Sequence, residues 1–421
     1  MSIASEIQRI KTNIANAYTS ASNKGATLPA TQNSANLSST IDTIQTGGTP
    51  TTVEWKDVNF IDYDGTLLHS YTIAEIQQLS ALPSLPSHPG LVCQGWNWTL
   101  ANIKSLNREV IVGAVYNTTD GSTKILIEIS SLTDATINLC LKSYSGSSTL
   151  TINWGDETIE SFTQGTSVGS YSHTYSAIGK FTITLSVPSG HYLLCGGTTV
   201  NYALFGNGSN NRAINYRSAN KVCGINIGSN FKYITAYMLN ETRNCKYVTI
   251  AEGVSITGSQ AFQQSSFECI VLPKSVTKTQ TYCFSTCRCL KTISLPNELT
   301  DIGNYAFQMC YVLKNITFGN SISSIGSSVF TGANLYSGIN NEVNTSQCNA
   351  SMYSSTGVVE VTTTATTIGA SCFNSCTHLY KVICLGDVTS VGNSAFGSTY
   401  SLTLVDFTHC TTVPTARYKH I

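Results

Sequence analysis

The sequence predicts a multidomain, mainly β protein that ends in a solenoid of stacked coils. Three observations indicate this class. Phenylalanine recurs at a near-constant interval through the second half of the chain, apolar and polar residues alternate with period two in the middle, and helical spacing is confined to short segments near the N-terminus. We divide the 421 residues into a helical anchor with its linker, an α+β spacer, a β-sandwich and the solenoid, at 1–50, 51–122, 123–190 and 200–421.

The composition excludes several classes of protein. Charged residues make up 11% of the chain, with Lys plus Arg and Asp plus Glu both at 23, and no basic run appears. Nucleic-acid binding needs clustered cations, so we expect no such partner. No segment approaches the roughly 20 apolar residues of a membrane-spanning helix, and the N-terminus lacks the apolar stretch of a signal peptide. Sparse charge with many small polar residues suits adhesins and virion proteins better than cytosolic enzymes.

The first 50 residues predict an oligomerising helix. Isoleucines recur at intervals of 4, 3 and 4 residues, which places them on one seam of a coiled coil, and isoleucine at both seam positions favours trimers over dimers. The seam residues are Ile3, Ile7, Ile10 and Ile14. The alternative is a short amphipathic helix that packs on its own chain. A second short helix is predicted at 36–44, before a Gly and Pro linker at 47–50.

The segment Val58–Leu68 resembles the first motif of haloacid-dehalogenase-like phosphatases. The resemblance implies that Asp62 is a nucleophile and Asp64 a general acid, with Mg²⁺ between them. That fold needs an alternating parallel α/β sheet, whereas prolines and all-β patterning follow here. We therefore favour a β-hairpin that turns at Asp64 and Gly65.

The rest of the spacer predicts helices at Ser70–Leu82 and Trp96–Leu106, and strands at Val110–Val115 and Thr123–Ile129. The segment resembles an N-terminal module that recurs in tail and fibre-like proteins of gut-bacterial phages. The phrases that carry this resemblance are VNFIDYDGTLLHSYT, LSALPSLPSHPGL and QGWNWTL.

The sandwich contains Trp154-Gly155-Asp156, then His173-Thr174-Tyr175 and a closing strand that includes Phe181. These marks resemble the PKD-type immunoglobulin-like domain, and the resemblance implies structural roles for Asp156 and His173. Trp154, Tyr175 and Phe181 are expected to fill the core. Glu157 departs from the glycine frequent in that family, which puts the turn in doubt. A catalytic His–Asp pair is the alternative, but no nearby serine or cysteine has a nucleophile signature.

The repeats carry the clearest signal. In each unit a Phe is followed by a turn of small residues and then by a short strand. The phenylalanines are Phe262, Phe284, Phe307, Phe330, Phe373 and Phe396, at intervals of 22, 23, 23, 43 and 23 residues. Extrapolation backwards places Leu239 and Tyr216 at the same position. The pattern resembles the BspA-type leucine-rich repeat, which implies stacked coils with parallel strands and a shared core.

Two further positions recur in each coil. An aliphatic residue five places before the Phe is expected in the core, and the glycine after it is expected where the backbone turns sharply. The aliphatic residues are Ile302, Ile325, Ile368 and Val391, followed by Gly303, Gly326, Gly369 and Gly392. Strands are predicted at 225–227, 248–250, 269–272, 290–295, 313–318, 379–384 and 402–407.

Five of the 15 cysteines recur at fixed positions of the repeat. Those three residues after a Phe are Cys287, Cys310 and Cys376, and those directly before one are Cys283 and Cys372. Other coils have Ser, Ala, Thr or Val there, so we predict buried free thiols that replace small residues. Oxidation of stacked thiols and a zinc site from Cys283, Cys287 and Cys289 are the alternatives.

The period breaks between Gly332 and Gly357, in a stretch rich in Asn and Tyr. Irregular loops on a rigid scaffold are favoured binding sites, so we predict receptor contacts there. The candidates are Asn334, Tyr336, Asn340, Asn341, Asn344 and Tyr353. A degenerate coil without a role is the alternative.

Together these features predict a structural virion component, such as a phage tail fibre, that adheres to the host cell through its repeats. The expected partners are other copies of the chain in a trimer, virion proteins at the N-terminus, and a host surface glycan or protein. We predict no catalytic residues, cofactor or metal. The alternatives are a bacterial surface adhesin, and an enzyme that is either a phosphatase using Asp62 and Asp64 or a glycan-degrading fibre.

Overall fold

The computed structural model divides the chain into two compact units, Met1–Glu54 and Trp55–Ile421. It describes residues 53–195, 203–206, 217–313, 316–331, 359–376 and 379–411, together with Ile14 and Tyr18; at 359–362 the description is limited to the backbone. Ile14 is helical and partly buried. The other three seam isoleucines and the second predicted helix lie outside the described residues, so the anchor stays a prediction.

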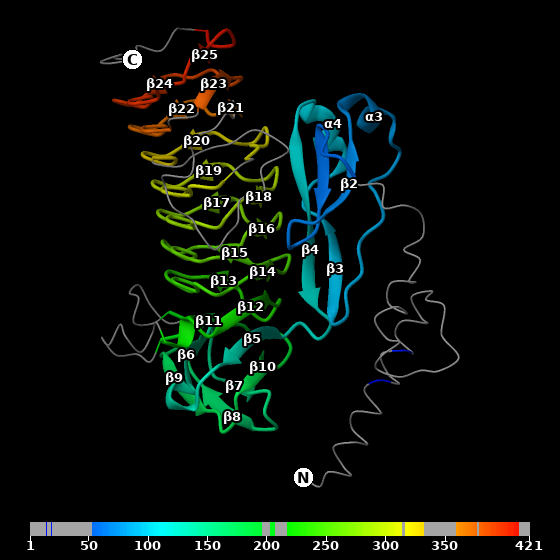
Figure 1. Cartoon of the computed structure of the whole chain (residues 1–421), viewed down its shortest axis with the longest axis vertical. Coiled ribbons are helices and arrows are strands. Elements are labelled where there is room, and N and C mark those ends of the chain that lie inside the picture. The colour runs from blue at the N-terminus through cyan, green and yellow to red at the C-terminus, as the bar shows by residue number, and fades with distance from the viewer. Residues whose placement is uncertain are drawn as a thin grey trace. The chain divides into compact units, whose positions relative to one another are not determined.

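The α+β module forms a four-stranded sheet in the order β2-β1-β4-β3 (Figure 1). Strands β1 (Val58–Ile61) and β2 (Leu67–Tyr71) are antiparallel, and the chain between them turns through Gly65 at φ +91°. This confirms the predicted hairpin. Strand β4 (Val110–Thr118) pairs parallel with β1 and antiparallel with β3 (Leu91–Trp96).

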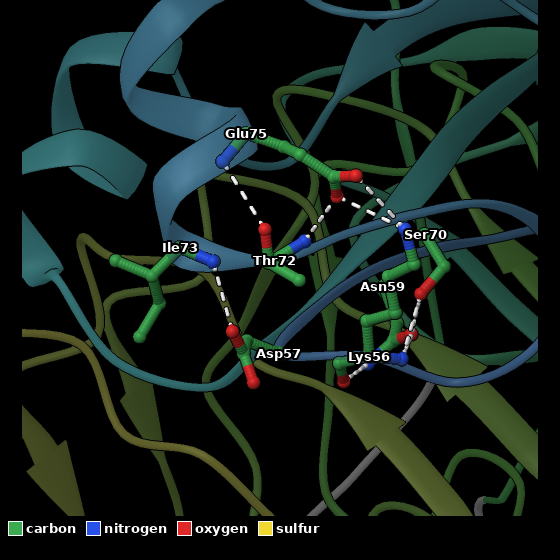
Figure 2. A network of polar contacts seen from close by, with 7 residues as sticks. All are labelled: Lys56, Asp57, Asn59, Ser70, Thr72, Ile73 and Glu75. Carbon is green, nitrogen blue, oxygen red and sulfur yellow. Dashed lines mark hydrogen bonds and ion pairs between the residues drawn. The ribbon is translucent and has the colours of Figure 1, made fainter.

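Helix α3 (Ile73–Gln78) is much shorter than the predicted helix at 70–82. It begins at a capping box, in which Thr72 Oγ1 accepts from Glu75 N and a Glu75 carboxylate oxygen accepts from Thr72 N at 2.6 Å. Figure 2 shows this box beside Asp57, whose Oδ2 accepts from Ile73 N. Lys56 Nζ contacts both Glu75 oxygens at 3.0 Å. The cap therefore fixes the helix start two residues after β2.

The apolar spacing that predicted longer helices arises from packing outside helices. Leu79 and Leu82 pack against the module core although α3 has already ended. Trp96 completes β3, and α4 (Leu100–Leu106) begins only after the cap residue Thr99, whose side chain accepts from Asn102 N. The apolar residues therefore keep a helix-like spacing in segments whose backbone is not helical.

Two sheets follow the module and share one core. The larger has the order β14-β12-β5-β10-β7-β8 and the smaller the order β11-β6-β9. Their strands are β5 (Thr123–Ile129), β6 (Thr136–Ser143), β7 (Ser148–Asn153), β8 (Ile159–Gln164), β9 (Gly169–Thr174), β10 (Gly179–Ser186) and β11 (Leu193–Cys195). Strand β5 has the predicted bounds. The inward residues Ile125, Leu139 and Trp154 are fully buried, whereas the PKD-type resemblance stays a prediction.

The solenoid is joined to this sheet without a break. Its first described strand, β12 (Val222–Ile227), pairs antiparallel with β5 and parallel with β14 (Tyr247–Ile250). One hydrophobic core runs from Ile125 in β5 to Phe396 in the last described coil. The predicted sandwich and solenoid are therefore continuous in both hydrogen bonding and packing.

The coils contribute parallel strands on two sides. One side carries β12, β14, β16 (Cys269–Val271) and β18 (Thr292–Ser294), and later β21 (Val359–Thr363), β23 (Leu379–Cys384) and β25 (Leu404–Asp406). The other carries β13 (Tyr233–Ile234), β15 (Ser255–Ile256), β17 (Lys278–Thr279), β19 (Asp301–Ile302), β20 (Ser324–Ile325), β22 (Thr367–Ile368) and β24 (Ser390–Val391). Residues 316–318 form no strand, contrary to expectation. There Arg108 of the module donates to Phe318 O at 2.6 Å.

The repeated phenylalanines form one file of stacked rings. Successive ring centroids from Phe262 to Phe396 are 5.0, 5.5, 5.6, 5.5 and 5.5 Å apart, and neighbouring ring planes differ by at most 9°. Leu239 is fully buried at the equivalent position, while Tyr216 lies outside the described residues. The predicted aromatic column is confirmed.

The recurring aliphatic residues are buried as predicted, except that Val391 is only partly buried. A turn begins at these glycines as predicted, since Ala306 N donates to Gly303 O and Cys372 N to Gly369 O, but the turn does not use the positive φ that glycine allows. None of the four has φ in the left-handed region. Instead, a Cβ at Gly369 would lie 2.3 Å from Gly326 C, and one at Gly392 would lie 2.3 Å from Ala370 N. Glycine is required because adjacent coils bring their backbones together at this position.

We expect Phe307→Ala to lower the free energy of unfolding of the solenoid by about 3–5 kcal/mol, because it empties the middle of the ring file. Urea denaturation followed by circular dichroism measures this loss. Met309→Ala is the matched control, since Met309 lies two residues away and is 39% exposed; we expect its effect to stay within about 0.5 kcal/mol. Equal effects would contradict the central role of the ring file.

Candidate functional site

Asp62 lies directly after β1 and is almost fully buried. Its Oδ1 accepts from Tyr116 Oη at 2.7 Å and from Tyr63 N at 2.8 Å. Its Oδ2 lies 2.6 Å from His88 Nε2. Both carboxylate oxygens are therefore occupied by groups that hold the hairpin turn against β4 and the proline-rich loop.

Asp64, the second acid of the phosphatase-like motif, is occupied in the turn itself. Its Oδ1 accepts from Thr66 N at 2.9 Å. Among the described residues, no group of three or more His, Cys, Asp or Glu side chains is placed to hold a metal ion. The motif therefore closes a β-hairpin and gives both carboxylates structural partners.

The corner of the sandwich brings together the residues singled out for the PKD-type resemblance. His173 Nε2 lies 2.7 Å from Asp156 Oδ2. The imidazole stacks on Trp154 with centroids 4.9 Å apart and planes 15° apart. Tyr175 Oη donates to Trp154 O at 2.8 Å. These contacts bind the turn to the core, which agrees with structural roles for Asp156 and His173.

In this corner the hydrogen bonds of the Asp156 carboxylate stabilise the fold, whereas the backbone conformation of Glu157 destabilises it. Burial raises the pKa of Asp156, but hydrogen bonds from His173 and Thr158 outweigh it, and the net pKa lies below the ordinary value. The stabilisation is thus present above the pKa of an unfolded Asp and is lost as the pH falls through the folded pKa. Gly155 and Glu157 have φ of +86° and +74°. Glutamate therefore occupies a conformation that favours glycine.

The cysteines after each Phe form a hydrogen-bonded column. Cys287 Sγ donates to Phe262 O at 3.0 Å, and Cys310 Sγ donates to Phe284 O at 3.1 Å. Ser265 takes this position in an earlier coil, and its Oγ donates to Leu239 O at 2.7 Å. Cysteine here is a donor as well as a small residue, which the sequence interpretation missed. The presence of Ser265 at the same repeat position is the feature of the sequence from which a hydrogen-bond donor could have been predicted.

These thiols are protonated at neutral pH. Burial raises the pKa of Cys283 and of Cys310 to about 12, and that of Cys287 further above its ordinary value. All cysteines of the described residues are free, which agrees with the predicted free thiols. The hydrogen bond from Cys287 Sγ to Phe262 O gives this thiol a structural role.

The α+β module covers the outer side of the strands β16 and β18. Ile61, Ile111 and Val115 of the module pack against Cys269 and Val271 of the solenoid. The fit is close, because a Cβ added at Gly113 would lie 2.4 Å from Val271 Cγ1. This part of the parallel sheet is unavailable to another partner.

Buried polar contacts fix the same interface. Asn97 Nδ2 donates to Leu272 O at 3.0 Å and to Ser294 Oγ at 2.9 Å. Trp98 Nε1 donates to Leu295 O at 2.8 Å. Ser294 Oγ donates in turn to Ile111 O at 2.7 Å. Trp98 thus belongs to the module core and also docks the solenoid.

Another side of the solenoid carries turns with unusual backbone. The residues two before and two after each ring have left-handed φ between 53° and 62°. They are Tyr237, Glu241, Gln260, Gln264, Tyr282, Thr286, Tyr305, Met309, Ser328, Ser371, Ser375, Ser394 and Ser398. Around each ring, every second backbone N–H group points to the next coil, and the N–H groups between them donate within their own coil. Tyr282, Phe284 and Thr286 accordingly donate to the next coil at 2.9, 2.9 and 2.7 Å.

The turn columns are the candidate binding surface of the described residues. Apart from Glu241, which is 4% exposed, their side chains are partly or fully exposed, and the hydrogen bonds between module and solenoid described above do not involve them. Sequence reasoning missed this surface, because Tyr, Gln, Thr and Met are not residue types that signal left-handed backbone. The six predicted receptor-contact residues of the 332–357 stretch lie outside the described residues, so their role stays a prediction.

Within the part of the chain that the structure describes, no helix has the length and apolar character needed to cross a bilayer.

Comparison with known proteins identifies the repeats. Residues 214–336 and 336–420 match the BspA type leucine-rich repeat region in six copies. The C-terminal part of the chain therefore carries BspA-type leucine-rich repeats, as the sequence predicted. A search of the curated proteins finds no match.

Solved structures of other leucine-rich-repeat proteins resemble the same part. A leucine-rich-repeat protein of T. pallidum is 19% identical, with 43% of this chain and 84% of that one covered and a TM-score of 0.33. A leucine-rich-repeat protein of Bacteroides ovatus is 21% identical (44% and 66% covered, TM-score 0.23). A leucine-rich cell surface protein of Faecalibacterium prausnitzii is 17% identical (45% and 60% covered, TM-score 0.28).

We expect Cys310→Ser to change stability little and Cys310→Val to destabilise by about 1 kcal/mol, because only serine keeps a donor for Phe284 O. Chemical denaturation of the two variants in parallel measures the difference. Ser265→Cys is the reciprocal control and should also be tolerated. If valine were as stable as serine, the hydrogen-bonded column would contribute nothing.

We expect Glu157→Gly to raise the stability of the sandwich by roughly 0.5–1 kcal/mol, since it relieves left-handed strain at an exposed side chain. Thermal unfolding monitored by tryptophan fluorescence measures the shift. Gly155→Ala should act oppositely, because its Cβ would lie 2.7 Å from Thr182 O. A destabilising Glu157→Gly would show that the glutamate side chain has a role that its geometry does not reveal.

Proposed function

We propose that this chain is a non-enzymatic adhesion protein that binds a glycan or protein on a host cell through the turn columns of its solenoid, as part of a virion appendage such as a phage tail fibre. One observation carries the proposal. The chain's own module occupies the outer side of β16 and β18, whereas the turns that carry Tyr282 and Tyr305 keep partly exposed side chains within the part of the chain that the structure describes.

The chemistry of the chain supports binding rather than catalysis. Asp62 and Asp64 are held by hydrogen bonds inside a hairpin, and the Asp156–His173 pair ties a turn to the core. Sparse charge favours recognition by neutral polar and aromatic groups over electrostatic attraction.

The virion assignment rests on the sequence resemblance at 1–122. In this proposal the isoleucine seam assembles a homotrimer and docks on other virion proteins. Light scattering of the purified chain measures the stoichiometry, and a monomer would remove the trimer from the proposal.

We expect gold-labelled antibody against residues 200–421 to decorate tails or fibres in electron micrographs of purified particles, with preimmune serum as control. Labelled, purified full-length chain should bind host cells saturably, and the unlabelled chain should compete with it. Label confined to the bacterial envelope would favour a bacterial surface adhesin, and failure to bind any cell would contradict the adhesion role.

A further inference from the structure

The column two residues before each ring changes character along the solenoid. It contains a glutamine and two tyrosines in consecutive coils and then only serines. The residues are Gln260, Tyr282, Tyr305, Ser328, Ser371 and Ser394, all with left-handed φ between 53° and 60°. The change from an aromatic ring to a serine hydroxyl, which we call the step, falls between Tyr305 and Ser328.

The backbone does not require these tyrosine rings. A bulky residue at positive φ is an uncommon and strained choice. Ser328 and Ser371 adopt the same conformation with φ of 55° and 53°. Serine therefore meets the conformational demand of the coil, so Tyr282 and Tyr305 contribute something that serine does not, namely partly exposed aromatic surface.

Among the described residues, no side-chain ring fills the position next to the second face of the Tyr305 ring. Tyr282 and Tyr305 stack with centroids 4.5 Å apart and planes 6° apart, so one face of each ring is used. The next coil continues the backbone ladder, since Tyr305 N donates to Ser327 O and Phe307 N to Val329 O. It places Ser328 where the next ring would stand, and no other described ring stacks on Tyr305. The rise per coil is roughly 4.8 Å, so the step forms a notch with an aromatic wall.

The walls and floor of this notch are neutral and rich in hydroxyls. Residues 303–306, 326–329 and 369–372 include no charged side chain. Among the described residues, the hydroxyls of Ser328 and Ser371 have no hydrogen-bond partner. The position thus combines an apolar ring face with free hydroxyl groups and has no charge to attract an ionic ligand.

We infer that the notch between Tyr305 and Ser328 binds a single neutral sugar residue. Its apolar C–H face lies on the open face of Tyr305 by dispersion, in the place of a third stacked ring. Its hydroxyls bond to Ser328 and Ser371. This assignment rests on the proposed adhesion function and names the ligand class of its surface.

Saturation-transfer NMR of the full chain with methyl glycosides of glucose, galactose, mannose and N-acetylglucosamine tests the inference. At least one should bind, with saturation strongest at the C–H protons of one ring face. Tyr305→Ser removes the wall and Ser328→Tyr fills the notch, so each should weaken binding by at least about tenfold. Tyr400→Ser is the matched control, because Tyr400 is 85% exposed in the last described coil, and its binding should be unchanged.

Ser328→Tyr keeps the test decisive, since it adopts the geometry that Tyr305 already shows and should leave the melting curve of the solenoid unchanged. No binding by the native chain, or equal binding by all three variants, would overturn the sugar assignment. Cell adhesion of the same proteins separates the two proposals. Adhesion without glycoside binding refutes only the sugar, whereas glycoside binding without adhesion refutes only the adhesion role.

Discussion

Axial alignment of each coil on its neighbour is the constraint on which the rest of the solenoid depends. The ring file fixes the spacing, because rings 5.0–5.6 Å apart and nearly parallel tolerate little lateral shift. The N–H groups around each ring donate to the next coil only if the flanking residues are left-handed. The same alignment brings Gly369 against Gly326 and places the Cys310 thiol beneath Phe284 O. The left-handed residues, the glycines and the hydrogen-bonded cysteines of the solenoid thus all result from the alignment of one coil on the next.

Periodicity let the sequence predict what repeats and little of what does not. The ring file, Leu239 as its earlier member and the strands at 225–227 and 248–250 followed from a 23-residue interval alone. The hairpin at Asp64-Gly65 followed from turn chemistry. Helix lengths failed, because Leu79 and Leu82 keep helical spacing while packing from extended backbone. The docking of Asn97 on Ser294 spans 197 positions, and no local pattern encodes it.

The candidate site shows the same division. The PKD-type resemblance implied structural roles for Asp156 and His173, and their contact with each other and with Trp154 agrees with such roles. It could not foresee that the module would cover β16 and β18, because that depends on the shape of two faces folded separately. It also directed attention to an irregular loop, whereas the described candidate surface is the most regular part of the molecule. A binding position is hard to recognise in a repeat sequence when the backbone conformation stays the same and only an exposed side chain differs, as between Tyr305 and Ser328.

The pairing of β12 with β5 has a mechanical consequence. A protein with the adhesion role proposed here transmits tension from one end to the other. Here the repeats and the sheet before them share a strand edge, with Ile225 opposite Ile125 and Asn226 opposite Lys124, and a single apolar interior. Such a joint has no hinge to extend under load. Force along the strands must shear several main-chain hydrogen bonds together, so the junction should yield late and abruptly rather than bend.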